Sequence, residues 1–485
     1  MNRHSPLHTN PLPCFSRREF LSRAGTGFGI LGLAGLFAEQ GLFAADPSLS
    51  TIVNPLAARA PQFPARAKHV IHLLANGGPS QMDTFDPKPA LAKYAGQRLP
   101  FHLETERPTG VALPSPFSFR PYGQSGIEVS ELFGKLAEKH IDDLCIIRSM
   151  HTETPIHENS LRMMNCGDSR MARPSVGAWL TYGLGTENQN LPGFVVLIPQ
   201  GMPVAGADNW QSAFLPGPYQ GCYVETWNKQ LNQLIENLQN SDLSGEEQRS
   251  QLDLLQKLNQ KHLAESNNHP ALEARIHNFE TAFRMQISAT DAFDIEKEPQ
   301  DVRDMYGDKA QAKQMLMARR LVERGVRYVQ VWHGGMQPWD SHENIESEHR
   351  RLADECCQGI TALLTDLKQS GLLDETLVIW GGEFGRTPAV ELPQVGTVKT
   401  PTGRDHNPYG FTVWLAGGGV KGGMVHGATD EFGFRAVEDR VQVHDLHATI
   451  LHLMGLDHEK LTFRHSGRDY RLTDVHGQVV RAVLA

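Results

Sequence analysis

The sequence has little cysteine, no excess of basic residues and no hydrophobic run long enough to favour a transmembrane span. The net charge of −9 and the pI near 6.2 imply no basic face, so we expect no nucleic-acid partner. Six cysteines without CxxC spacing disfavour a thiolate metal site and a disulfide-stapled scaffold. They are Cys14, Cys145, Cys166, Cys222, Cys356 and Cys357. We find no internal repeat.

What the chain does have is the composition of a globular protein, with 40% apolar and 21% charged residues in 485. This length allows two or three domains. Single α/β domains with insertions also reach it, so length alone does not set the domain count.

The N-terminus resembles an export signal. The stretch "SRREFL" (Ser16 to Leu21) precedes the weakly hydrophobic, Gly-rich run "GTGFGILGLAGLFA" and small residues at Ala44 and Ala45. Twin arginines before such a run are typical of the twin-arginine pathway. We therefore expect residues 1–45 to be a signal peptide read by the twin-arginine translocase, with the mature protein in the periplasm or cell envelope. Export of a folded chain would allow a cofactor to be loaded in the cytoplasm.

After a Pro- and Ala-containing linker (46–66), short β-branched apolar runs recur, each ending in glycine or polar residues. Runs that are apolar throughout are typical of strands buried on both faces of a mostly parallel sheet covered by helices. The six runs are "AKHVIHLLANGG" and residues 142–150, 193–199, 327–332, 376–382 and 411–419.

Helical patterns lie between the runs. "KQMLMARRLVERG" ends in glycine before the 327–332 run, and "EHRRLADECCQGITALLTDLKQSG" precedes the 376–382 run. This strand–helix alternation predicts an α/β fold over 67–475. The polar, Gln-rich and amphipathic stretch at about 228–292 predicts a helical insertion over the sheet rather than an independent domain.

Ligands of open α/β sheets lie beyond the carboxyl ends of the strands, so the residues after each run are the first candidates for a site. These residues are strongly polar. They include Asn76, Ser80 and Asp83 after the first run; His157, Glu158 and Asn159 after the second; His333, Asp340, His342 and Glu343 after 327–332; Glu383 and Arg386 after 376–382; Arg404, Asp405 and His406 beyond it; and His444, Asp445 and His447 at a late helix.

Asp and His pairs with a nearby Glu supply oxygen and imidazole ligands that suit zinc, manganese or calcium. One pair alone is a weak signal, because a single histidine is usually a core or surface group. Carboxylate, imidazole or guanidinium side chains recur at four or five successive strand ends, and this recurrence favours a binding or catalytic site. A purely structural interpretation, with helix-cap and turn roles for "WDSHEN" and "TGRDHNP", is the alternative.

Longer motifs resemble a known family. The stretches "NGGPSQMDTFDPKP", "WDSHEN", "GLLDETLVIWGGEFGRTP", "GRDHNPYGFTVWLAGGGVKGGMVHGATDEFG" and "DLHATILHLMGLD" resemble the exported domain-of-unknown-function 1501 (DUF1501) family, within the alkaline phosphatase and sulfatase superfamily. The resemblance spans about 66–460. It implies a three-layer α/β/α fold, alkaline phosphatase-like, with a metal-binding region at the carboxyl edge of the sheet.

The resemblance also implies metal ligands. "WDSHEN" lies where the superfamily has an Asp/His pair after a strand, and "VIWGGEFG" resembles the strand that ends in Ser-Asp-His-Gly. The first strand ends in Asn76 instead of the usual ligating Asp, so Asp83 becomes a displaced substitute. The expected divalent-metal ligands are Asp340, His342, Glu383, Asp405, His406 and Asp83.

The nucleophile position departs from the superfamily. "HENSLRMMNCG" puts His157 where sulfatases have a cysteine, which excludes formylglycine chemistry. His157 could attack or act as an acid, and Thr152 or Thr154 could serve instead. Arg386 or Arg404 could hold an anionic ester bidentately. We assign His157, Thr154 and Arg386 to catalysis, and Arg404, Ser80 and Asn159 to substrate binding.

Two functional hypotheses follow. The first is an exported, metal-dependent hydrolase of a phosphate or sulfate ester. The second keeps the fold and the metal without chemistry: a periplasmic or surface binding protein for anionic polysaccharide. The substituted nucleophile favours the second hypothesis, and the density of Asp/His pairs favours the first.

Overall fold

The computed structural model describes residues 55–188, 190–226, 291–393 and 401–485, with scattered positions between 247 and 258. The predicted signal peptide and most of the predicted insertion at about 228–292 lie outside the described residues. Within the described part of the chain, no helix has the length and apolarity to cross a membrane. The five cysteines of this part are free thiols.

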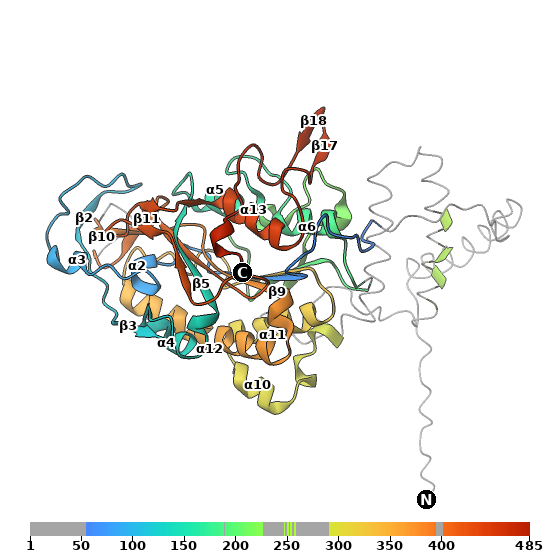
Figure 1. Ribbon diagram of the computed structural model, residues 1–485, viewed down its shortest axis with the longest axis horizontal. Helices are drawn as coiled ribbons and strands as arrows, with labels where there is room; N and C mark the ends of the chain where they lie inside the picture. Colours follow the sequence, from blue (N-terminus) through green and yellow to red (C-terminus); the bar gives the residue numbers. More distant parts are fainter. Residues whose placement is uncertain are drawn as a thin grey trace, which may run out of the picture.

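A central sheet of nine described strands organises the domain (Figure 1). Its order is β13, β5, β12, β9, β1, β8, β6, β7, and β16 pairs with β5. Neighbours pair in parallel, except β12, which is antiparallel to both β5 and β9. The bounds are β1 His69–Leu74, β5 Leu144–His151, β6 Phe194–Ile198, β7 Cys222–Glu225, β8 Tyr328–Trp332, β9 Thr376–Gly381, β12 Phe411–Ala416, β13 Met424–His426 and β16 Val441–Gln442.

All six apolar runs predicted as strands are strands of this sheet, and the mostly parallel arrangement is confirmed. Burial on both faces explains their composition. In β1, Ile71 faces one hydrophobic core and Val70 faces the other, and both side chains are fully buried. Each such side chain contributes about 1.5–3 kcal/mol relative to exposure, so a central strand gains stability from both faces.

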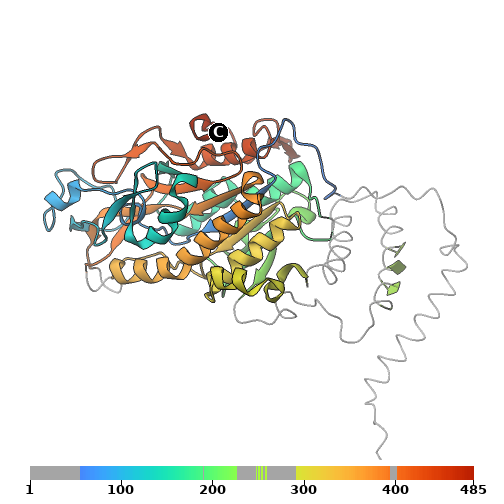
Figure 2. The same cartoon turned by 60° about the horizontal axis from the view of Figure 1, so that its bottom comes forward.

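Helices cover both faces and make three layers, which confirms the predicted α/β/α architecture (Figures 1 and 2). In α12, buried Leu352, Cys356, Ile360, Leu363 and Leu367 recur every three or four residues, as an amphipathic helix requires. One layer contains α4 Gly134–His140, α10 Gln300–Tyr306, α11 Ala310–Glu323 and α12 Ile345–Gln369; the other contains α5 His157–Cys166, α6 Val176–Leu184 and α13 Val443–Leu453.

A small antiparallel sheet lies beyond the carboxyl end of β9. It contains β2 (Thr109–Ala112), β10 (Gly385–Glu391) and β11 (Arg404–Asn407), in the order β11, β10, β2. Figure 1 shows β2, β10 and β11 together at the left of the domain. Arg386 of β10 pairs with His406 of β11. The small sheet thus brings residues near 386 and 406 to the edge where the loops after β5 and β8 end.

Candidate metal centre

Three imidazoles surround one carboxylate oxygen at this edge. His157 begins α5, His342 lies in the loop after β8, and His406 belongs to β11. Their Nε2 atoms lie 3.2, 2.8 and 3.1 Å from Oδ1 of Asp340, respectively. Four side chains from three separate segments therefore converge on one point.

Each of the three rings contacts a different carboxylate through its other nitrogen. Nδ1 of His157 lies 2.6 Å from Oε1 of Glu383, and Nδ1 of His406 lies 2.9 Å from Oε2 of Glu106. Nδ1 of His342 bonds Oε2 of Glu391. The six residues form three carboxylate–imidazole pairs that all point inward.

This arrangement determines what the rings can bind. A carboxylate that accepts from Nδ1–H fixes the orientation of a ring, as it does for metal-binding histidines, so that Nε2 can bind a metal once its own proton is released. Nε2 of His157 is buried and has no hydrogen-bond partner among the described residues, although it lies close to Asp340. His157, Asp340 and His406 each offer a ligand atom, and these atoms lie within 4.8 Å of one another. The donor set therefore fits a divalent cation.

Electrostatics favour a cation as well. Burial alone would raise the pKa of the Asp340 carboxyl, but the Arg386 guanidinium and the three imidazoles outweigh burial and hold that pKa far below its usual value. Asp340 is thus ionised at neutral pH. Five carboxylates face two guanidiniums and three imidazoles here: Glu106, Asp340, Glu383, Glu391 and Asp405 against Arg107, Arg386 and the three rings. Burial alone would lower the pKa of His157 and of His342, but their hydrogen bonds to these carboxylates outweigh burial and raise it. Protons therefore balance part of the negative charge, and a divalent cation would replace them.

Asp405 lies beside His342 and His406, with its two oxygens in different surroundings. Oδ2 accepts a hydrogen bond from the backbone N–H of Arg107 at 2.8 Å, and Oδ1 is buried without a partner in the described structure. Burial raises the pKa of this carboxyl. Asp405 belongs to two further groups able to hold a metal, one with Glu106 and His406 and one with His342 and Glu391.

Glu383, which the sequence predicts as a ligand, lies behind His157 instead. Its carboxylate is fully buried and accepts two hydrogen bonds from the backbone N–H of Gly77, at 3.0 and 3.1 Å, besides the contact with Nδ1 of His157. Gly77 has a φ of 110°, and a side chain there would meet the backbone of Trp339 and Asp340. Glu383 therefore orients the His157 ring and anchors the loop after β1.

Three other predicted site residues form a separate buried cluster, an ion pair between Asp83 and Arg404 to which Ser80 is hydrogen-bonded. Asp83 accepts from Arg404 Nε at 2.8 Å and from Nη2 at 3.2 Å, and both side chains are fully buried. Ser80 donates its hydroxyl to the same carboxylate. Asp83 is in none of the metal-binding groups found among the described residues. Because the side chains of Arg404 and Ser80 are fully buried, they cannot contact a substrate in this structure.

Arg386 is buried as well and has structural contacts. Its guanidinium donates to the backbone carbonyls of Gly77, Gly78, Arg404 and Trp339, and to Oδ1 of Asp340 at 2.6 Å. It therefore joins the loops after β1 and β8 to the small sheet. In this position it holds Asp340 and is not exposed to an anionic ester.

Thr154 and Asn159 flank the start of α5. The Thr154 hydroxyl accepts from the N–H of Ile156 at 3.2 Å. Asn159 lies two residues after His157 and is partly exposed. Neither side chain is among the groups that converge on Asp340.

Sequence reasoning missed three residues of the cluster. Glu106 and Arg107 lie in the loop before β2, and Glu391 ends β10. Arg107 Nη1 lies 3.2 Å from Oε1 of Glu391 and 3.2 to 3.3 Å from the ring nitrogens of His342, and 28% of its side chain is exposed. No strand-end motif precedes "ETERP", so only the fold places this loop at the site.

Several solved structures are similar at low identity. The sulfatase PsFucS1 from Pseudoalteromonas sp. is 13% identical, covering 88% of this chain and 70% of that one, with a TM-score of 0.33. The lipoteichoic acid synthase LtaP from Listeria monocytogenes is 9% identical, covering 86% and 78%, with a TM-score of 0.36. Alkaline phosphatase from the Antarctic bacterium TAB5 is 8% identical, covering 82% and 99%, with a TM-score of 0.29. At these values, the likeness assigns neither an activity nor site residues.

Comparison with curated proteins gives no match. The model of a protein family does match, over residues 67–484, which includes every residue of the cluster. The family is described as "Protein of unknown function (DUF1501)", the family that the sequence motifs resemble. The chain belongs to the DUF1501 family.

Proposed function

We propose that the protein is a metal-dependent hydrolase of phosphate or sulfate esters. One observation supports this proposal above all others: three Nε2 atoms face one carboxylate oxygen, while each Nδ1 is held by its own carboxylate. A divalent cation held by the three Nε2 atoms and Asp340 would replace the protons that these nitrogens otherwise share with the carboxylate, and the carboxylate behind each ring orients it for this role.

The donor types favour particular ions. Imidazole nitrogens with a carboxylate suit zinc or manganese, whereas calcium prefers oxygen ligands alone. The residues that would hold the ion are His157, His342, His406 and Asp340. A bound divalent cation polarises an ester oxygen and lowers the pKa of a water.

The protein groups have distinct roles in this proposal. Glu106, Glu383 and Glu391 keep the three rings in one tautomer and orientation. Arg386 positions Asp340 and offsets its charge. Arg107, partly exposed beside His342, is the cation available to the anionic group of the ester, in place of the buried Arg386 and Arg404.

Export belongs to the same proposal. The twin arginines at Arg17 and Arg18 would send the chain, already folded, through the twin-arginine translocase to the periplasm or cell envelope. Folding before export suits a centre whose ligands come from segments far apart in the sequence, because the cation can then be loaded in the cytoplasm.

A non-catalytic, metal-containing protein that binds anionic polysaccharide is the second candidate. The position where the superfamily resemblance places a nucleophile holds His157, whose Nε2 faces Asp340, and the nearby Thr154 hydroxyl is bonded to the backbone. This observation favours capture of an anion without a covalent step.

Metal analysis and activity assays test the proposal together. Purified protein should contain at least one divalent cation per chain and hydrolyse 4-nitrophenyl phosphate or 4-nitrophenyl sulfate. Asp340→Asn should lose both the metal and the turnover. The control Asp143→Asn should retain both, because Asp143 contacts the buried ring of His140 at 2.9 Å, away from the cluster. Metal without turnover would favour the binding protein, and absence of metal would contradict both candidates.

A further inference from the structure

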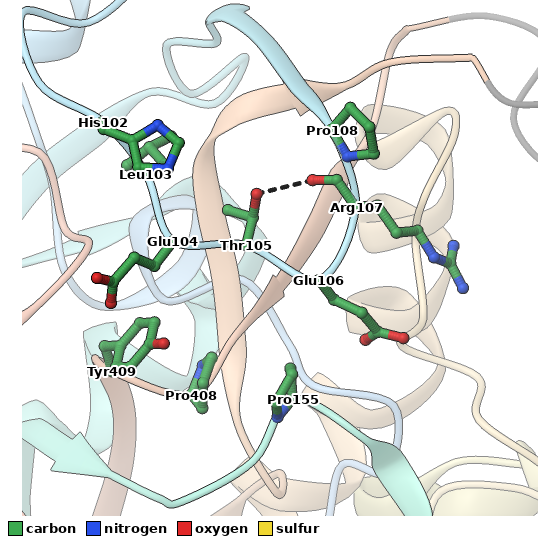
Figure 3. A pocket seen from close by; sticks show the side chains of 10 residues that line it. All are labelled: His102, Leu103, Glu104, Thr105, Glu106, Arg107, Pro108, Pro155, Pro408 and Tyr409. Atoms are coloured by element: carbon green, nitrogen blue, oxygen red, sulfur yellow. Dashed lines mark hydrogen bonds between the residues drawn. The ribbon is translucent and has the colours of Figure 1, made fainter.

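A cavity of about 510 Å³ opens beside the candidate metal centre (Figure 3). The Glu106 carboxylate lines it and contacts Nδ1 of His406. Pro155 and Pro408, on the opposite wall, lie two residues from His157 and His406, respectively. A group that fills the cavity therefore lies next to the imidazoles. The volume is within the usual range of small-molecule sites, roughly 300–1,000 Å³.

The wall formed by residues 102–108 is held in place by several contacts. Leu103 is buried and packs with Ala389 and Phe434 in a small hydrophobic cluster that also contacts Tyr409. The Thr105 hydroxyl donates to the Arg107 carbonyl at 2.7 Å. The Arg107 N–H donates to Asp405 at 2.8 Å. The cavity is thus preformed.

Its lining is poorly suited to an anion. Two carboxylates face the space, and Figure 3 shows the Arg107 guanidinium directed away from it. That guanidinium contacts Glu391 and His342 instead. Arg435, a cation near the cavity, bonds Glu104 at 2.8 Å and lies 4.4 Å above the ring of Tyr409. Among the described residues that line the cavity, no unpaired guanidinium faces the space, so a sulfate or phosphate inside it would meet the two carboxylates.

The lining suits hydroxyl groups on an apolar frame. Ionised Glu104 and Glu106 can only accept hydrogen bonds, and hydroxyl groups donate them. Pro155, Pro408 and Tyr409 offer apolar surface to the carbon skeleton of a ring. We propose that this cavity is a subsite for the uncharged, hydroxyl-bearing part of the ester, so that the substrate is a phosphate or sulfate ester of a sugar. This inference rests on the proposed function for the ester chemistry, and on the cavity alone for sugar binding.

Binding and turnover are measured separately on the full, metal-loaded protein. The binding probes are the methyl glycosides of glucose, galactose and mannose, followed by saturation-transfer NMR. At least one glycoside should bind, and Glu104→Ala and Tyr409→Ala should each weaken its binding tenfold or more. The matched control is Glu131→Ala, a glutamate that pairs with Arg350 away from the cavity. Thermal midpoints of all variants show whether any loss is a loss of folding.

Turnover is compared between hexose 6-phosphates or 6-sulfates and the 4-nitrophenyl esters. Glu104→Ala should lower kcat/KM for the best hexose ester at least tenfold relative to the aryl ester, because an aryl group has no hydroxyl for the carboxylate. If no glycoside in the panel binds, or if the folded variants bind it as wild type does, the subsite is overturned even if aryl esters are hydrolysed. If glycosides bind as expected but no ester is hydrolysed, the proposed function fails and the subsite stands.

Discussion

Oε2 of Glu106 lies 2.9 Å from Nδ1 of His406, 300 positions later in the chain. The same ring directs Nε2 at Oδ1 of Asp340, 3.1 Å away. One imidazole therefore links the loop before β2 to the loop after β8. The pKa of the Glu106 carboxyl is lowered, chiefly by this contact, so the glutamate is ionised at neutral pH and accepts the Nδ1 proton.

Glu106→Gln tests whether this contact supports a metal ligand. The amide keeps the size of the side chain but removes the charge that orients and polarises the ring. We expect metal affinity to fall about 10- to 100-fold, the usual effect of losing such a partner, as measured by competition with a chelator. Because 34% of the Glu106 side chain is exposed, the unfolding free energy should change little.

Asp143→Asn is the matched control for that experiment, since it removes a carboxylate from the Nδ1 of a buried histidine outside the cluster. Unchanged affinity in Glu106→Gln would mean that His406 is not a ligand. An equal loss in the control would point to a general effect on folding.

Asp83, unlike Glu106, should matter for the stability of the fold and not for metal affinity. Asp83→Leu would leave the fully buried guanidinium of Arg404 without its carboxylate, which typically costs about 3–5 kcal/mol. The double variant Asp83→Leu/Arg404→Met should recover much of that loss, because it removes the uncompensated charge. Urea unfolding measures both variants.

Metal content separates this structural role from a ligand role. Folded Asp83→Leu should contain as much metal per chain as wild type. A variant that folds normally and lacks metal would return Asp83 to the ligand set that the sequence suggests.

The fold could be predicted from the sequence because its signals are local. A run such as residues 376–382 is apolar at every position, and β9 pairs on both sides and is buried on both faces. The regular spacing of Leu352, Cys356 and Ile360 likewise predicts the buried stripe of α12. Each pattern contains the information for its own element.

The site could be predicted only in part. Asp340, His342 and His406 meet as the strand-end rule suggests, because loops that leave one sheet edge gather there. The sequence does not show which carboxylate lies toward the centre and which lies behind a ring. Glu383 follows a strand as a ligand would, yet it bonds Nδ1 of His157. No sequence pattern marks Glu106 as a site residue, because its partner His406 lies 300 residues away in the chain.

Metal removal should lower the stability of the folded domain. A ligand that binds only the native state stabilises it by about 2.7 kcal/mol at a concentration 100 times its Kd. Treatment with EDTA should therefore lower the thermal midpoint, and zinc or manganese should restore it. Asp340→Asn should show neither change, because it lacks a ligand. If the purified wild-type protein contains no metal and its thermal midpoint does not change with EDTA, the proposed metal centre is wrong.

Two histidines far from the centre predict an acid sensitivity of the fold. His72 lies in β1 with Nδ1 2.9 Å from the hydroxyl of Tyr328, and His447 lies in α13 with Nε2 2.8 Å from the Met164 carbonyl. Burial lowers the pKa of each ring from 6.5 to about 3. The unfolded chain therefore takes up these protons first as the pH falls. Their contribution to stability is complete above pH 6.5 and is lost progressively towards pH 3.

At pH 5, each ring should cost roughly 2 kcal/mol of stability relative to neutral pH. Urea unfolding in EDTA, which removes any contribution from metal release, measures this slope. In His447→Gln, the unfolding free energy should fall less between pH 7 and pH 5, by about the contribution of one ring. The control for the loss of a histidine is His465→Gln, in the exposed hairpin of β17 (Phe463–His465) and β18 (Arg468–Tyr470). Burial is the chief cause of the lowered pKa of His447. A variant with the wild-type slope would therefore mean that the ring becomes charged without unfolding.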